Sequence, residues 1–219
     1  MQARRRPLHQ RFLFKLSFKY LSLIKIWLRV LVRLFVAVEI ENSDVLRNVT
    51  RFRDAIVSCS KGKGIKGVED ENIHLTLRFI GEVPDSYVPQ ISECVSRANE
   101  FTKFQVRIEG VGAFPSVSRP RVLWVGITEG FDKLRAIRNR LEECLRRYAE
   151  PDREEFVPHI TVGRVKGSYD NVCLKNVIST YENTLFGLTQ VSKVKLKKSI
   201  LRPEGPVYTD ITVVDLKDG

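Results

Sequence analysis

The chain has 219 residues, enough for one large domain or two small lobes sharing a core, and its 43% hydrophobic and 29% charged residues are typical of a soluble globular protein. The net charge of +11 indicates an anionic partner, with nucleic acid favoured over a membrane surface, but residues 1–31 hold eight basic residues and no acidic one. The rest of the chain is therefore only mildly basic, at +3.

The first segment, from Phe12 to Val38, is apolar but is interrupted by five basic residues. These charges argue against a membrane-spanning helix, and the absence of a cleavage site of small residues argues against a signal peptide. The four-residue spacing of Lys25, Arg29 and Arg33 leaves open an amphipathic helix on a membrane or on RNA. We favour another interpretation, in which residues 1–31 are a basic extension translated from a mis-called start. The folded domain then comprises residues 32–219.

The first part of this domain alternates between strand-like and helix-like segments. We expect strands over 33–39, 73–81 and 104–111, separated by helices over 42–59 and 86–99. The first helix begins at the capping residues Asn42-Ser43-Asp44. Its apolar positions recur at spacings of three or four residues and are Val45, Val49, Phe52 and Ile56.

The second part repeats this order. We expect strands over 121–127 and 158–165, helices over 131–148 and 171–181, and closing strands over 190–201 and 207–214. The repetition suggests an internal duplication with a pseudo-two-fold axis. It predicts an α+β fold of two pseudo-symmetric lobes, each a sheet with helices, around a central cleft.

The four cysteines are widely spaced and include no CxxC pair: Cys59, Cys94, Cys144 and Cys173. This spacing fits neither a zinc site nor a disulfide framework, so we expect a reduced, cytoplasmic protein without a bound metal.

Two tetrapeptides carry the chemistry, His74-Leu75-Thr76-Leu77 and His159-Ile160-Thr161-Val162. On a β-strand, alternate side chains share a face, so each His lies beside its Thr while the apolar residues point into a core. A lone histidine on a strand is usually structural. Two of the chain's three histidines in the same setting instead indicate acid–base chemistry on a phosphate, with both strands facing one space.

The residues around these tetrapeptides resemble a known family. His74–Val83 and Phe156–Arg164 are similar to the paired signatures of the 2H phosphoesterases, and more narrowly of the bacterial and archaeal RNA 2′,3′-cyclic phosphodiesterases, formerly called 2′–5′ RNA ligases. Arg33–Glu39, Arg121–Gly126 and Leu201–Tyr208 also fit, so that the resemblance covers about residues 32–214.

The resemblance implies a bilobal α+β fold with a basic cleft between the lobes. It implies opening of a terminal 2′,3′-cyclic phosphate on RNA to a 2′-phosphate, without a metal or nucleotide cofactor, and the reverse joining of ends through a 2′–5′ bond. The implied partner is RNA with 2′,3′-cyclic phosphate ends, for example tRNA fragments. We expect no membrane association and a monomer.

The residue types suit this reaction. Histidine titrates near neutral pH, so one of the pair can be a base and the other an acid, and a bell-shaped pH profile follows. Thr76 and Thr161 can donate to the non-bridging oxygens. By family analogy His74 is the general acid and His159 the general base, although pseudo-symmetry leaves the reverse assignment open.

Three arginines are candidates for substrate binding. Arg164 stands where the family has a phosphate-contacting arginine, but regular alternation would place it on the face opposite to His159, so a bulge or the strand end must turn it inward. Arg78 has the parity to share the face of His74 and Thr76. Arg121 could also line the cleft; alternatively, it lies at an exposed strand end and has no role in binding.

Other residues have less specific interpretations. Lys193, Lys195 and Lys197 form a row on one strand face, which we expect to be solvated, with a track for the RNA backbone as the alternative. Trp124 and Phe79 are expected in the core, unless one of them stacks on a terminal base.

Two alternative functions remain open from sequence. One is the same chemistry on small cyclic nucleotides, which a closed pocket instead of a long basic groove would favour. The other is a non-catalytic RNA- or nucleotide-binding module, against which the intact His and Thr residues argue. A metal-dependent phosphoesterase is disfavoured because no cluster of ligands is evident.

Overall fold

The computed structural model describes residues 30–61, 64–152, 155–203 and 205–219. Contacts divide the chain into two units, Met1–Leu31 and Val32–Gly219. The expectations for the basic extension fall almost entirely on residues 1–29, which lie outside the described residues. The fold is that of the second unit.

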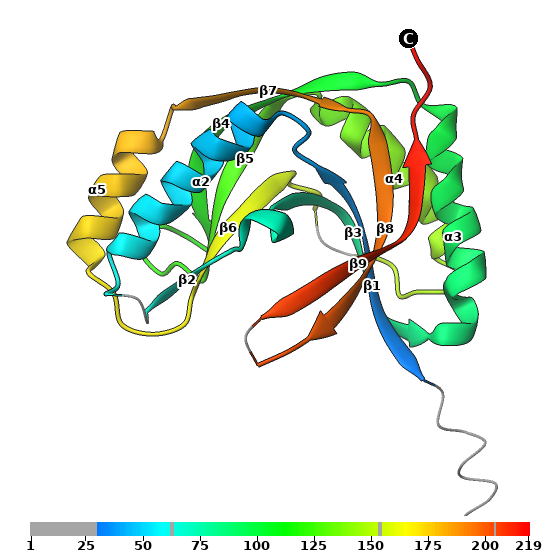
Figure 1. Cartoon of the computed structure of the whole chain (residues 1–219), viewed down its shortest axis with the longest axis horizontal. Coiled ribbons are helices and arrows are strands. Elements are labelled where there is room, and N and C mark those ends of the chain that lie inside the picture. Colours follow the sequence, from blue (N-terminus) through cyan, green and yellow to red (C-terminus); the bar gives the residue numbers. More distant parts are fainter. Residues whose placement is uncertain (1–29, 62–63, 153–154, 204) are drawn as a thin grey trace, which may run out of the picture. The chain divides into compact units, whose positions relative to one another are not determined.

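The described chain forms a mixed α+β structure, which confirms the predicted fold class (Figure 1). Its elements are, in order, β1 (Leu31–Glu39), α2 (Ser43–Ser58), β2 (Ile65–Gly67), β3 (His74–Pro84), α3 (Val88–Ser96), β4 (Phe104–Phe114), β5 (Val122–Glu129), α4 (Phe131–Leu145), β6 (His159–Val165), α5 (Asn171–Tyr181), β7 (Leu185–Val191), β8 (Lys193–Leu201) and β9 (Pro206–Asp215). Short 3₁₀ turns precede β3 and flank α3.

Local sequence signals position most of these elements. The Asn42 side chain caps α2 by accepting hydrogen bonds from the backbone N–H groups of Asp44 and Val45. Asp170 caps α5 in the same way. Both helices begin within one residue of their predicted starts, and for α2 the capping residue was recognised in the sequence.

The closing strands differ from the prediction. The single strand expected over 190–201 is wrong, because two strands, β7 and β8, meet at Ser192. The backbone N–H and hydroxyl of Ser192 both donate to the Glu41 carboxylate, at 2.9 and 2.6 Å. The short strand β2 was also missed, because its three residues, one of them a glycine, are too few to show an alternating pattern.

The strands form one sheet in the order β7-β4-β5-β6-β3-β1-β8-β9, with β2 paired to β6. The neighbouring strands pair in antiparallel fashion in β7–β4, β4–β5, β5–β6, β6–β3, β1–β8, β8–β9 and β2–β6. The two strands that begin with the histidines, β3 and β6, are neighbours at the centre of this order. Their antiparallel pairing is limited to Leu75 and Ile160.

Two pairs of helices cover different halves of the sheet (Figure 1). The His159 half consists of β7, β4, β5, β6 and β2, with α2 and α5 packed on it; the His74 half consists of β3, β1, β8 and β9, with α3 and α4. The sequence repeat does not coincide with these halves. Helix α2 belongs to the first repeat but packs on β6 and β7, and α4 belongs to the second but packs on β3. Each repeat thus supplies a helix to the other half.

The cysteines overturn the expectation of a reduced chain. Cys59 forms a disulfide with Cys173, and Cys94 forms one with Cys144. The first joins the end of α2 to α5 and the second joins α3 to α4, so that one disulfide connects the two helices of each half. The separations of 114 and 50 residues in sequence concealed both pairs, because only the packing of the helices brings them together.

No helix within the described residues is long and apolar enough to cross a membrane.

Candidate active site

The pairing of β3 with β6 brings the two tetrapeptides together. Because Leu75 pairs with Ile160, an antiparallel register places His74 opposite Thr161 and Thr76 opposite His159. Leu75 and Ile160 are buried, whereas the two histidines and two threonines are half-buried. Alternation along each strand therefore sets these four polar side chains on one face of the sheet, which we call the site face.

His74 is held by hydrogen bonds on both ring nitrogens. Its Nδ1 lies 2.7 Å from the Asn72 carbonyl oxygen and its Nε2 lies 3.1 Å from Thr76 Oγ1. Since a carbonyl only accepts, Nδ1 carries the proton, and in the neutral ring the Thr76 hydroxyl donates to Nε2. The ring packs against Phe35 at 5.0 Å and against Tyr208 at 5.4 Å between centroids.

His159 is oriented by the same backbone device. Its Nδ1 lies 2.8 Å from the Val157 carbonyl oxygen, two residues earlier in the chain, as in His74. In both neutral rings Nε2 is therefore the unprotonated, basic nitrogen. The aromatic neighbours of His159 are Phe114, at 5.0 Å between centroids, and Trp124, at 6.4 Å.

Burial sets the protonation of both histidines in the free protein. Desolvation lowers the pKa of His74 to about 4, against the opposing hydrogen bond to the Asn72 carbonyl, and the positive charges of Lys197 and Arg164 lower it further. Desolvation also lowers the pKa of His159, and Arg164 acts in the same direction. Both rings are thus neutral at pH 7.

Arg164 reaches the site face through a bulge. Leu123 of β5 pairs with Gly163, but the next residue, Trp124, pairs with Thr161, so that Val162 is an extra residue in β6. The bulge reverses the alternation after it. Arg164 is exposed and returns to the face of His159, where its charge lowers the pKa of both histidines.

Arg78 does not line the site, and the expectation from its parity is wrong. Its side chain is 4% exposed, and its Nε donates to the Glu142 carboxylate of α4 at 2.6 Å. The same guanidinium also donates to the carbonyl oxygens of Phe79 and Glu150. Leu77 and Arg78 are consecutive buried residues, so alternation fails in β3 at the position where the bulge occurs in β6.

Arg121 lies directly before β5, the strand next to that of Arg164, and opposite Val165, so its side chain points to the face opposite to that of Arg164. The backbone N–H of Val165 donates to the Arg121 carbonyl oxygen, which continues the register that pairs Val122 with Arg164. Alternation then directs the exposed Arg121 side chain away from the site face. The sheet therefore does not bring this residue to the histidines.

The lysines of β8 are not a solvated row. Lys197 has a side chain only 7% exposed and lies 2.7 Å from the Glu39 carboxylate and 2.6 Å from that of Asp210. Lys195 contacts the same two carboxylates at 2.7 and 2.8 Å. Only Lys193 is half exposed, beside Asp215. Two lysines and two carboxylates thus balance one another beside His74, which leaves little charge for an RNA backbone.

Aromatic residues around the histidines were missed from sequence or placed wrongly. Phe35 and Tyr208 contact each other at 4.9 Å and both contact His74. Tyr208 ends the last segment that resembles the family, which was the available signal. Trp124 is half-buried and packs over Gly112, where an added Cβ would come within 2.3 Å of the indole. Phe79 was expected in the core but is 61% exposed.

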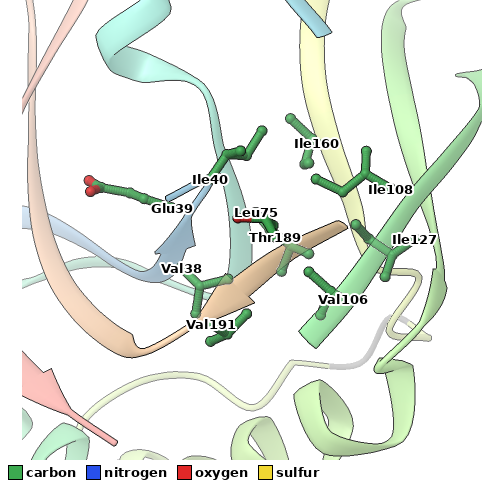
Figure 2. A pocket seen from close by; sticks show the side chains of 10 residues that line it. All are labelled: Val38, Glu39, Ile40, Leu75, Val106, Ile108, Ile127, Ile160, Thr189 and Val191. Carbon is green, nitrogen blue, oxygen red and sulfur yellow. The ribbon is translucent and has the colours of Figure 1, made fainter. Parts of the chain in front are cut away.

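The pocket in Figure 2 lies on the other face of the sheet. Leu75 and Ile160, which alternate with the site residues, line it together with apolar residues of β1, β4, β5 and β7. Its lining is apolar apart from Glu39 and Thr189, and neither the apolar side chains nor the Glu39 carboxylate suits a phosphate. Within the described residues, no group of three or more His, Cys, Asp or Glu side chains is arranged to hold a metal ion.

The sequence matches a family of known proteins. A sequence model of the 2′-5′ RNA ligase superfamily matches residues 41–198. The RNA 2′,3′-cyclic phosphodiesterase of Aeropyrum pernix is 40% identical over 161 residues, which are 73% of this chain and 90% of that protein. The RNA 2′,3′-cyclic phosphodiesterase of Archaeoglobus fulgidus is 37% identical over 183 residues, which are 84% of this chain and 99% of that protein.

Solved structures share the fold. A crystal structure of the Thermus thermophilus protein TT0787 has a TM-score of 0.68 and 29% sequence identity, and the match covers 85% of this chain and 98% of that one. Apo LigT of E. coli also has a TM-score of 0.68, at 22% identity, covering 86% and 99% of the two chains.

Proposed function

Because the chain belongs to the 2′-5′ RNA ligase superfamily, we propose that it is a hydrolase that opens the 2′,3′-cyclic phosphate at an RNA end to a 2′-phosphate. One observation carries this proposal beyond the family: the pairing of Leu75 with Ile160, which sets two His/Thr pairs on one face of the sheet. In this reaction, water attacks phosphorus, the P–O3′ bond breaks, and O3′ takes a proton.

The two histidines perform the proton transfers. One accepts the proton of the attacking water at Nε2, and the other donates its Nε2 proton to the departing O3′. Both Nε2 atoms are available because each Nδ1 is occupied by a backbone carbonyl. We assign His74 as the general acid and His159 as the general base, following the family resemblance.

The threonines and Arg164 bind the phosphate. The Thr76 hydroxyl, which donates to His74 in the free protein, turns to a non-bridging oxygen when His74 becomes protonated. Thr161, which makes no hydrogen bond to His159 in the described structure, donates to the other non-bridging oxygen. Arg164 donates to the phosphate from the end of β6 and balances the charge that grows in the transition state. Arg78 has no part in this step, and Arg121 contributes at most to the approach of RNA.

The substrate itself completes the protonation of the acid. His74 is neutral in the free protein at pH 7, since burial lowers its pKa to about 4. A bound phosphodiester carries a negative charge and raises the pKa of a nearby imidazole. The acid therefore gains its proton as the cyclic phosphate binds. The pH profile of kcat should then extend to higher pH than that of kcat/KM.

The proposal extends to the natural substrate, the cellular location, the oligomeric state and the bounds of the catalytic domain. We propose that RNA ends, including those of tRNA fragments, are hydrolysed in the cytoplasm by a monomer whose catalytic domain is residues 32–219. Reverse 2′–5′ joining uses the same groups in the opposite order.

Hydrolysis of a short RNA ending in a 2′,3′-cyclic phosphate, with EDTA present, tests the proposal. We expect a 2′-phosphate product, and losses of about 10²- to 10⁴-fold for His74→Ala and for His159→Ala. Leu188→Ala, an exposed position on β7, is the matched control and should retain full activity. Binding of this RNA without turnover would instead support the non-catalytic module, and turnover of mononucleotides alone would support the small-substrate alternative.

A further inference from the structure

Four charged side chains of β1, β8 and β9 close into a ring of ion pairs, which we call the charge ring. It consists of Glu39, Lys195, Lys197 and Asp210. Each carboxylate contacts both lysines, one with each of its oxygens, at distances from 2.6 to 2.8 Å. Buried ion pairs gain little stability over apolar side chains of similar size, because each charge loses its hydration. The charge ring therefore indicates a role other than stability.

Strand register places the charge ring on the site face, beside His74. Phe35 of β1 pairs with Lys197 of β8, and Lys197 pairs with Asp210 of β9. Residues directly opposite each other on neighbouring strands share a face of the sheet. The ring of Phe35 lies 5.0 Å from that of His74 between centroids. Figure 2 shows the Glu39 carboxylate pointing away from the apolar residues of the pocket on the other face. The charge ring thus lies on the same side of the sheet as His74, next to Phe35.

The two lysines of the charge ring are not equivalent with respect to His74. Lys197 is opposite Phe35, whereas Lys195 is opposite Ala37, one step farther along the same face. Since Phe35 is the residue of β1 that contacts His74, Lys197 is the nearer lysine along the sheet. Both lysines contact the same carboxylates. They contribute alike to the packing of the ring but unequally to the charge at His74.

Charged groups on several strands act on His74. Burial lowers the pKa of His74 most, against the opposing hydrogen bond to the backbone. Among the charges, Lys197 of β8 lowers this pKa, Glu39 of β1 raises it by less, and Arg164 of β6 lowers it further. Tyr208 of β9 also faces His74, but burial raises the pKa of its hydroxyl, which is neutral at pH 7. The charge ring therefore acts on His74 as a positive group, although its own charges sum to zero.

We propose that Lys197 is a positioning residue for the general acid: acting past Phe35, its ammonium keeps His74 neutral until the negatively charged phosphate binds. This inference rests on the proposed function and adds to it the group that controls when the acid is charged. Once His74 has taken up a proton in the complex, the same ammonium makes the imidazolium a stronger acid toward the departing O3′. Glu39 and Asp210 hold Lys197 in place.

An NMR titration of the histidines in the full chain tests this proposal without relying on turnover. The chain has three histidines, and His74→Ala assigns the signal of His74. Lys197→Met should move the titration midpoint of His74 upward by about 1 pH unit, because a nearby buried positive charge is lost. Lys195→Met is the matched control. It removes the same charge from the same ring and should move the midpoint less.

Glu39→Gln should have the opposite sign and keeps the test open if Lys197→Met does not fold. It removes a negative charge beside His74, so the midpoint should move downward. The same signs are expected in kcat/KM on a cyclic-phosphate RNA at pH 7, where few molecules of the free protein carry a protonated acid. We expect a rise of about 2- to 10-fold for Lys197→Met and a comparable fall for Glu39→Gln. A merely structural ring would lower kcat/KM in both variants.

The outcomes separate this inference from the proposed function. An unchanged His74 midpoint in folded Lys197→Met would overturn the inference while hydrolysis stands. Equal shifts in Lys197→Met and Lys195→Met, or an upward shift in Glu39→Gln, would overturn it as well. If the wild-type protein hydrolyses no cyclic-phosphate RNA, the proposed function falls, and the role of Lys197 toward a general acid falls with it.

Discussion

The His74 half and the His159 half present the same strand motif in different surroundings. Both histidines direct Nδ1 to the carbonyl two residues earlier, at 2.7 and 2.8 Å. His74, however, is hydrogen-bonded to its threonine and lies beside Phe35, Tyr208 and a cluster of two lysines and two carboxylates. His159 lies beside Phe114 and Trp124, and within the described residues its Nε2 has no hydrogen-bond partner.

This difference teaches how a duplicated strand acquires two roles. The backbone device, which depends on the strand alone, is common to both halves and gives each ring the same tautomer. The neighbours come from other strands, and they set how strongly each ring resists protonation. An acid and a base can thus arise from one motif without a change in the motif itself.

Exchanging the leaving group should separate the two roles, and we expect this effect to be the largest. A cyclic phosphate with sulfur in place of O3′ departs as a thiolate and needs no general acid. With this substrate, His74→Ala should recover most of the 10²- to 10⁴-fold loss expected on RNA, while His159→Ala should remain impaired. Recovery by His159→Ala alone would reverse the assignment. Rates of ring opening for the two variants on both substrates measure the effect.

The two arginines of the motif strands should respond in opposite ways. Arg164→Ala should lower kcat/KM by about 10- to 100-fold, because charged hydrogen bonds to the phosphate are lost. It should leave the thermal stability nearly unchanged. Arg78→Ala should leave Glu142 without its buried partner and lower the free energy of unfolding by about 3–5 kcal/mol. Activity of the folded fraction should be retained. Loss of activity in a stable Arg78→Ala protein would contradict this division.

Sequence reasoning succeeded where a local rule was sufficient. Alternation placed His74 beside Thr76, and the capping residue Asn42 placed the start of α2. It failed where the outcome depended on other elements. The bulge at Val162 brings Arg164 to the site face, and the loss of alternation at Arg78 buries that arginine against Glu142. The sequence of neither strand indicates these irregularities.

The disulfides and the lysine cluster have the same cause. Cys94 and Cys144 lie on helices whose packing the sequence does not specify, and Lys197 meets Glu39 only because β8 pairs with β1. Long-range pairing also hid the exchange of helices between the repeats. The residues of the site could be named from sequence, but their surroundings could not.

The disulfides allow the stability of the two halves to be compared. Replacing either pair with alanines should lower the free energy of unfolding by about 4 kcal/mol, because closed loops of 114 and 50 residues differ little in chain entropy. Cys173 is half-buried, whereas Cys94 is fully buried. A mild reductant should therefore open the Cys59–Cys173 bond first. Thermal melts and mass-resolved thiol labelling test both expectations, and simultaneous reduction of the pairs would contradict the second.

The pH dependence should reflect the lowered pKa values. The reaction needs one protonated and one neutral histidine, and kcat/KM reports the free protein. Burial lowers the pKa of His74 to about 4 and that of His159 below its usual range. We expect a bell-shaped kcat/KM with its optimum below about pH 6.5, lost at low pH as both rings gain protons and at high pH as both lose them. An optimum above pH 7 would contradict these environments.

The central claim is that two halves of the sheet form one catalytic unit, and a double-mutant cycle on kcat/KM tests it most directly. His74→Ala, His159→Ala and the double variant would be compared with wild type on the same cyclic-phosphate RNA, with EDTA present. If the histidines act together in one step, the double variant should lose about as much activity as the more damaging single variant. Losses that multiply would show that the two histidines act independently and would contradict the claim.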